Sequence, residues 1–234
     1  MSLLNPPAIQ QLYERFHQPI AAFDCGKKCS PYNEGGIPFC CDTRHMVPTA
    51  YLAEWAYLKA NTTLWRLWDG NSRAETRRLQ SEAPPGQVLI ACLGHKQCQR
   101  EFRALTCRAF PFYPYFDSGG RFLGLSCYWE YADRCWVINH LEVVSPDYRN
   151  EFIAAFETLF QLQPAEREVY QRHSAVTRHL FTQKRRTIPL LHRDGLLYKI
   201  SPRNEILRPA RAADLPKYGP YRIAAQLPFP DELQ

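Results

Sequence analysis

The cysteines are the residues of this chain with the clearest capacity for chemistry. Nine of them lie within the first 135 residues of a 234-residue chain, and the rest of the chain has none. They are Cys25, Cys29, Cys40, Cys41, Cys92, Cys98, Cys107, Cys127 and Cys135. An odd number of cysteines cannot pair completely into disulfides within one chain. Clustered thiols in a reducing compartment are typical of a metal or redox site.

Thiolates bind zinc, iron–sulfur clusters and copper(I). Three arrangements fit nine thiols: one four-iron cluster with structural cysteines, two zinc or iron ions, or one zinc with a separate reactive thiol. Cys40 and Cys41 are adjacent, so their side chains diverge and rarely bind one small ion together. Three histidines near the cysteines in sequence are candidate substitute ligands: His45, His95 and His140. We therefore expect all nine cysteines to bind a 4Fe-4S cluster or zinc.

A second pattern follows the last of the spaced cysteines. The run Cys107-Arg108-Ala109-Phe110-Pro111-Phe112 comes after Cys92 and Cys98. This pattern resembles the YkgJ-type family of bacterial zinc- or iron-chelating proteins, which carry a CxxCxxCC cluster and a later CR-x-FPF segment. The first cluster departs from the family spacing, as C-x3-C-x10-CC. The resemblance covers about residues 23–136, and it implies metal binding but no particular reaction.

The cysteine arrangement is also similar, more weakly, to that of the flagellin lysine N-methylases, which implies an iron–sulfur cluster. Within the CR-x-FPF run, we expect Arg108 to place positive charge beside the thiolates and so reduce the cost of burying them. Phe110 and Phe112 would form a dry wall around the bound group. These three residues are the predicted cofactor-binding residues.

The charge of the chain is unevenly distributed. Residues 1–164 hold 16 Lys/Arg and 16 Asp/Glu, whereas residues 165–217 hold 12 and five, a net charge of +7. This basic stretch is a candidate nucleic-acid contact. Its candidate phosphate-binding residues are Arg167, Arg172, Arg178, Lys184, Arg185 and Arg186. No zinc-finger or RNA-recognition spacing accompanies them, so a solvated basic face without a partner is the competing interpretation.

Composition excludes several classes of protein. Apolar residues make up 45% of the chain and charged residues 22%, which is typical of a globular protein. No run approaches the ~18 consecutive apolar residues of a membrane helix. The N-terminus lacks the basic, apolar and cleavage regions of a secretory signal. We therefore expect a cytoplasmic protein without a membrane span.

The pattern of apolar and turn residues predicts an α+β fold, mostly helical and loop-rich, with a metal-stapled cysteine core, short strands and a C-terminal β-hairpin. Four parts are expected: an N-terminal helix in 1–22, a cysteine-cluster metal-binding domain in 23–144, a helical hairpin in 145–182, and a basic, Pro-rich β-hairpin tail in 183–234. A long helix is expected over 47–68, and the hairpin turn at Asp194-Gly195.

The function predicted from these observations is a metal-binding cysteine-cluster protein of unassigned reaction. Two alternatives stay open. One is an iron–sulfur-dependent protein-modifying enzyme with a lysine methylase-like activity, whose partner is a protein substrate. The other is a basic nucleic-acid-binding module that acts through residues 165–217.

Overall fold

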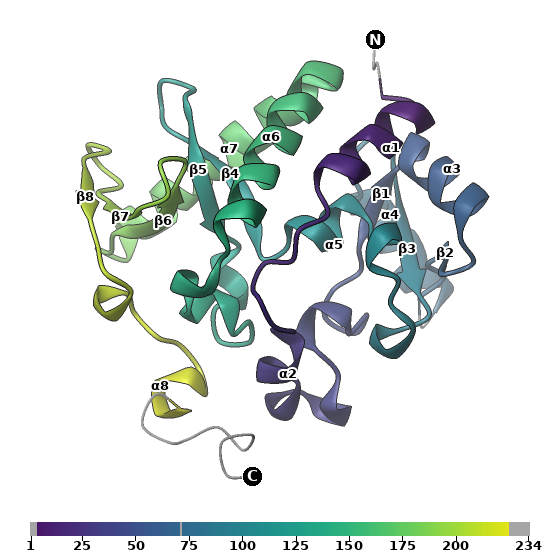
Figure 1. Cartoon of the computed structure of the whole chain (residues 1–234), viewed down its shortest axis with the longest axis horizontal. Helices are drawn as coiled ribbons and strands as arrows, with labels where there is room; N and C mark the ends of the chain where they lie inside the picture. Colours follow the sequence, from purple (N-terminus) through teal and green to yellow (C-terminus); the bar gives the residue numbers. More distant parts are fainter. Residues whose placement is uncertain (1–3, 71, 225–234) are drawn as a thin grey trace.

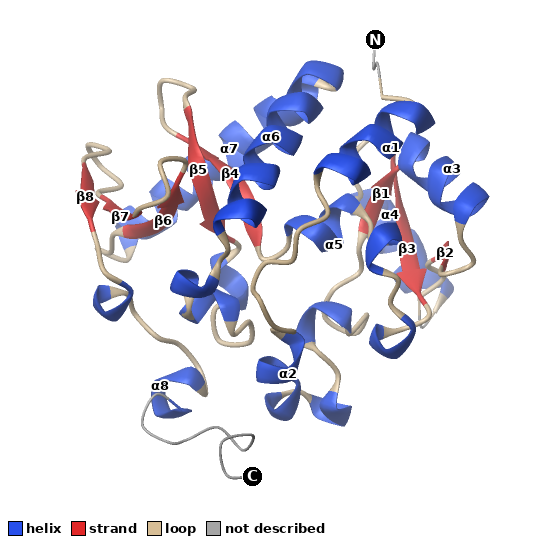
Figure 2. Ribbon diagram, viewed as in Figure 1, coloured by secondary structure: helices blue, strands red, loops and turns tan. Residues whose placement is uncertain are grey.

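The strands of this chain form two antiparallel sheets at opposite ends of the molecule, and helices lie between them (Figure 1). A computed structural model describes residues 4–70 and 72–224. The α+β class expected from the sequence is confirmed (Figure 2). None of the helices in these residues combines the length and the apolar character that crossing a bilayer requires.

The first helix, α1 (Pro6–Arg15), forms where the sequence predicts it. The side chain of Asn5 accepts a hydrogen bond from the backbone of Ala8, and proline occupies the first helical turn. Its buried face packs near α3 (Leu52–Asn61) and α5 (Leu105–Ala109). Glu54 of α3 joins all three helices, since it accepts hydrogen bonds from the Tyr13 hydroxyl at 2.7 Å and the Leu105 amide at 2.6 Å.

The smaller sheet lies beside these helices. Its strand order is β1 (Thr49–Tyr51), β3 (Gln87–Cys92), β2 (Trp65–Leu67), with both pairings antiparallel. Helix α4 (Arg73–Glu82) connects β2 to β3. The prediction of one long helix over 47–68 is wrong, since this stretch contains β1, α3 and β2. Its apolar residues form one face of α3 and also belong to the two strands that pair with β3.

The larger sheet has the order β4 (Phe112–Phe116), β5 (Phe122–Cys127), β6 (Ile188–His192), β7 (Leu197–Ile200), β8 (Leu207–Pro209). All four pairings are antiparallel. Strands β6 and β7 lie on either side of the expected Asp194-Gly195 turn. Strand β4 was missed because its aromatic residues are buried on both faces and show no alternation.

Two long helices cover the β4 end of this sheet (Figure 1). Helix α6 (Pro146–Leu162) begins at Ser145, whose side chain accepts a hydrogen bond from the Tyr148 amide, as its Ser-Pro-Asp start predicts. Helix α7 (Pro164–Gln183) follows after a single residue. The Ser174 hydroxyl of α7 accepts a hydrogen bond from the Phe116 amide at 3.0 Å and so fixes α7 against β4.

One hydrophobic core joins the two halves of the molecule, one built around the smaller sheet and the other around the larger sheet. Phe16, just after α1, contacts Tyr148 and Phe152 of α6 at ring-centroid distances of 5.4 and 5.9 Å. The remaining helix, α8 (Tyr221–Ala224), returns to the cysteine-rich part of the chain, where the Tyr221 hydroxyl donates to the Arg134 carbonyl at 2.8 Å. The last ten residues of the predicted tail lie outside the described residues.

Candidate functional site: a cluster of thiols around Arg103

Folding brings most of the cysteines into one region beside α2 (Gly26–Cys29) and α5. Cys25 precedes α2 and Cys29 ends it, while Cys40 and Cys41 lie in the short helix η3 (Phe39–Cys41). The other members come from distant segments of the chain: Cys92 ends β3, Cys98 follows the short helix η4 (His95–Gln97), and Cys107 lies in α5.

Electrostatic effects between the thiols show that they are close neighbours. The pKa of Cys25 is raised to about 11, first by burial and then by the charge of Cys29. Burial is likewise the main reason that the pKa values of Cys92 and Cys107 are raised. The charge of Cys41 also raises the pKa of both thiols. A raised pKa keeps a thiol protonated and inert.

Arg103 is the positive charge at this cluster. Its Nε donates a hydrogen bond to the Cys98 sulfur at 3.1 Å, and its charge also acts on Cys40 and Cys41. The guanidinium is largely buried, yet its pKa is raised by these sulfurs. A fixed guanidinium beside thiols favours their ionised form.

The adjacent cysteines are the pair in closest contact. The Sγ atoms of Cys40 and Cys41 are 4.0 Å apart; Cys40 is exposed and Cys41 is half-buried. The pKa of Cys41 is lowered, first by a hydrogen bond from Cys40 and then by the charge of Arg103. The same hydrogen bond raises the pKa of Cys40. Cys41 is thus the more acidic thiol of the pair.

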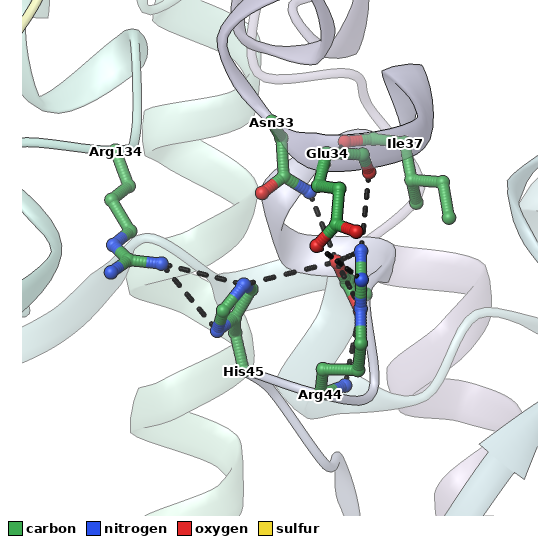
Figure 3. Close-up of polar contacts among 7 residues, drawn as sticks. Asn33, Glu34, Ile37, Arg44, His45 and Arg134 are labelled. Atoms are coloured by element: carbon green, nitrogen blue, oxygen red, sulfur yellow. Dashed lines mark hydrogen bonds and ion pairs between the residues drawn. The ribbon is translucent and has the colours of Figure 1, made fainter.

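The loop that carries this pair is fixed by Asp42. Asp42 is buried and accepts hydrogen bonds from Arg44 Nη2 at 2.7 Å and from Asn33 Nδ2 at 3.1 Å. Arg44 in turn forms an ion pair with Glu34 at 2.7 Å, as Figure 3 shows. The Arg44 guanidinium is the main reason that the pKa of Asp42 is held well below its usual range. These contacts hold residues 33–44 in one conformation.

The other predicted ligands lie apart or have other contacts. Cys127 is buried in β5, and its pKa is raised by burial and then by the charge of Cys135. Cys135 also interacts electrostatically with Cys25, Cys29 and Cys40, so it belongs to the cluster. His45 stacks on Phe39 and faces Arg134 (Figure 3). His140 stacks on Trp136 with a centroid distance of 4.1 Å.

Arg108 of the CR-x-FPF run has backbone carbonyls as its hydrogen-bond partners, and not the thiols as expected. Arg108 donates hydrogen bonds to backbone carbonyls, among them those of Arg103, Tyr13 and Phe16. It therefore satisfies the carbonyls at the end of α1, and Arg103 is the arginine in contact with a sulfur. Phe110 and Phe112 are buried, and they line a pocket on the side of α5 that Thr106 and Ala109 face.

The metal-binding function predicted from the sequence is wrong for the part of the chain that the structure describes. No three His, Cys, Asp or Glu side chains within it form a group able to hold a metal ion. The thiols are neighbours, but they do not converge on a common centre. The choice between an iron–sulfur cluster and zinc, and the ligand role of each cysteine, stay predictions from the sequence. The iron–sulfur-dependent enzyme rested on the same site and is withdrawn with it.

Several residues of the basic stretch have partners within the chain. Arg178 forms an ion pair with Glu205 at 3.2 Å, and Arg186 donates to the Tyr218 hydroxyl at 2.6 Å. Arg167 donates to the Gly120 carbonyl, and Arg172 lies 3.8 Å from Glu168. These contacts give the arginines a structural role. A nucleic-acid partner stays a prediction from the sequence.

One feature of the site was missed by sequence reasoning. A pocket of ≈ 340 Å³ lies between the two halves, and residues of α1, β1, α5, α6 and α7 line it. Its aromatic residues come from distant segments of the chain, and spacing in the sequence alone cannot tell a buried ring from one that lines a cavity. Comparison of this chain with known protein families, with characterised proteins and with solved structures finds no match.

Proposed function

We propose that this protein carries out thiol–disulfide exchange, with Cys41 as the attacking thiolate and Cys40 as the second thiol. The observation that carries the proposal is the contact between their sulfurs, 4.0 Å apart on a loop where Cys40 is exposed to solvent. The partner is a molecule that bears a disulfide.

The electrostatics of the cluster support the division of roles. Exchange requires a thiolate, because the protonated thiol is a poor nucleophile. The lowered pKa of Cys41 favours that thiolate, whereas burial raises the pKa of its neighbours Cys92 and Cys107. The charge of Arg103 lowers the pKa of Cys41 as well and so favours its ionised form.

The reaction balances within the pair and its partner. The Cys41 thiolate attacks one sulfur of the partner disulfide; the other partner sulfur leaves as a thiolate and takes a proton from water. Cys40 then loses its proton and attacks the Cys41 sulfur of the mixed disulfide. The Cys40–Cys41 disulfide forms, and the second partner sulfur leaves as a thiol. Two electrons pass from the cysteine pair to the partner.

A disulfide between adjacent residues suits a reversible reaction. Neighbouring Cα atoms are about 3.8 Å apart across a trans peptide, whereas relaxed disulfides span about 4.4 Å or more. The strained bond is easily reduced and so returns the protein to its starting state. Asp42 follows the pair directly and fixes the loop conformation in which the two sulfurs meet.

Single-cysteine variants test the proposal. Reduced, metal-free protein is mixed with oxidised glutathione, quenched in acid and analysed by mass spectrometry with peptide mapping. We expect Cys40→Ser to accumulate one glutathione on Cys41, because the second step is removed. Cys41→Ser should accumulate no adduct at Cys40 on the same time scale.

Cys98→Ser is the matched control, since it removes a neighbouring thiol but neither member of the pair. It should form the Cys40–Cys41 disulfide as wild type does. The proposal is contradicted if Cys40→Ser and Cys41→Ser react equally, or if oxidation of wild type joins other cysteines and leaves Cys40 and Cys41 free.

A further inference from the structure

The pocket between the two halves has the size of a small-molecule site. Its volume of ≈ 340 Å³ lies within the range of about 300–1,000 Å³ for such sites. It lies across α5 from the thiols: Thr106 and Phe110 line it, while Cys107 belongs to the thiol cluster. Nothing in the proposed exchange reaction uses it.

Aromatic rings make up much of its wall. Four tyrosines that line it are half-buried, as expected for rings that form the surface of a cavity: Tyr51, Tyr128, Tyr131 and Tyr170. Phenylalanines complete the wall: Phe16, Phe110, Phe112 and Phe156. The negative face of an aromatic ring attracts a cation within about 6 Å of its centroid, and desolvation strengthens the attraction.

The charged residues of the wall have one sign. Glu130 and Glu166 line the pocket, and no lysine or arginine does so among the described residues. His173 also lines it, and burial lowers the pKa of this histidine, so it is neutral at neutral pH. The pocket is therefore acidic in a chain with a net charge of +6.

Glu166 is the buried carboxylate of this site. It lies in the first turn of α7 and is 8% exposed, whereas Glu130 lies exposed at the rim. Its carboxylate accepts a hydrogen bond from Gln87 Nε2 at 3.3 Å and another from Tyr51. In the described part of the chain, no lysine or arginine forms an ion pair with it. Burial raises the pKa of Glu166, because a buried carboxylate without a counter-charge is costly, and a bound cation would remove that cost and favour the ionised form.

We propose that this pocket binds a small organic cation of the quaternary ammonium type, with its head group among the tyrosines and its charge opposite Glu166. A metal ion fits the wall poorly, because hard cations need several oxygen ligands and apolar rings supply none. An anion is disfavoured by the two carboxylates. A neutral apolar ligand would leave Glu166 without a counter-charge.

Choline and 3,3-dimethylbutan-1-ol test the proposal, because the two molecules have nearly the same shape and differ in charge. Binding to the full chain is measured by titration calorimetry and by the rise in unfolding temperature. We expect choline to bind at least about tenfold more tightly than its neutral counterpart. Equal affinities, or no binding of choline at millimolar concentration, would overturn the proposal.

Two variants on α7 test whether choline binds beside Glu166. Glu166→Gln keeps the shape and the hydrogen-bonding capacity of the side chain but removes its charge, and it should weaken choline binding about tenfold. Glu168→Gln is the matched control, since Glu168 is exposed and does not line the pocket, and it should bind choline as wild type does. Unfolding of both variants without ligand verifies that they fold. A folded Glu166→Gln protein with unchanged affinity would refute the assignment of Glu166.

Discussion

A lowered pKa distinguishes Cys41 from the neighbouring thiols of the cluster. Cys41 has a lowered pKa because Cys40 donates to it and Arg103 lies near. Burial has the opposite effect on Cys107, whose pKa is raised although the charge of Arg103 acts on it as well. The contact with Cys40 therefore distinguishes Cys41 from the other thiols, with the charge of Arg103 as a smaller contribution, and the number of cysteines alone does not predict it.

Replacing Arg103 should make Cys41 less reactive. Arg103→Gln removes the positive charge, so the pKa of Cys41 rises and less thiolate is present at neutral pH. The measurement is the rate of Cys41 alkylation by iodoacetamide as a function of pH, followed by peptide mass spectrometry. The midpoint of the profile should move upward in Arg103→Gln and stay in place in Arg100→Gln, which changes an exposed arginine nearby. An unmoved midpoint in Arg103→Gln would refute the role of Arg103.

Asp42 links the stability of the cysteine loop to pH. Asp42→Asn loses the charge opposite Arg44 and should lower the free energy of unfolding by about 1–3 kcal/mol at pH 7. Glu34→Gln, the control on the exposed side of Arg44, should cost below about 1 kcal/mol. Urea unfolding monitored by tryptophan fluorescence measures both.

The sign of the pH dependence follows from the lowered pKa of Asp42. Its ionised form stabilises the fold above the ordinary aspartate value of about 3.9, and this stabilisation is lost as the pH falls through the lowered value. The stability difference between wild type and Asp42→Asn should therefore shrink at acidic pH. A difference that grows on acidification would contradict this account.

At the scale of elements, the larger sheet depends on a close approach of β5 to β6. Gly124 of β5 has φ +150°, and a Cβ there would overlap the backbone of Leu191 and His192. We expect Gly124→Ala to destabilise the protein by about 1–3 kcal/mol or more. Gly119→Ala is the control, because Gly119 has ordinary backbone angles and space for a Cβ. Equal unfolding midpoints for the two variants would contradict the close approach.

Several elements could be predicted from sequence, and the failures have physical causes. The caps at Asn5 and Ser145 predicted α1 and α6, since a cap acts through residues next to it in the chain. The stretch 47–68 was misread because β1 and β2 exist only through pairing with β3, whose partner residues lie 23 to 40 positions away in the sequence. A pairing partner at that separation leaves no local signal.

The candidate site, like the fold, could be predicted from the sequence only in part. The gathering of thiols was expected from their spacing, yet the spacing could not show that they fail to converge on one metal centre. Arg108 was favoured by its place beside Cys107, but helical geometry turns neighbouring side chains apart. Arg108 donates to a backbone carbonyl, and the arginine that reaches a sulfur is Arg103. The acidic pocket depends on Glu166 of α7 meeting Tyr51 before α3, which only the tertiary fold determines.

For the whole molecule, the core between the two halves should make unfolding cooperative. Phe16 is 1% exposed and contacts α6 from the other half. Phe16→Ala should cost about 3–5 kcal/mol, whereas Phe23→Ala, at a residue 44% exposed, should cost much less. Circular dichroism and tryptophan fluorescence should give the same unfolding midpoint in urea. Two separate transitions in wild type would show that the halves unfold independently.

The redox equilibrium of the Cys40–Cys41 pair tests the central claim most directly. Metal-free, full-length protein is equilibrated with reduced and oxidised glutathione in varying ratio, the remaining thiols are alkylated, and each cysteine is assigned by peptide mass spectrometry. We predict one reversible two-electron transition in which Cys40 and Cys41 lose their thiols together and Cys107 stays reduced. Oxidation that spares this pair, or a disulfide between Cys40 and Cys41 that never forms at any ratio, would contradict thiol–disulfide exchange as the function.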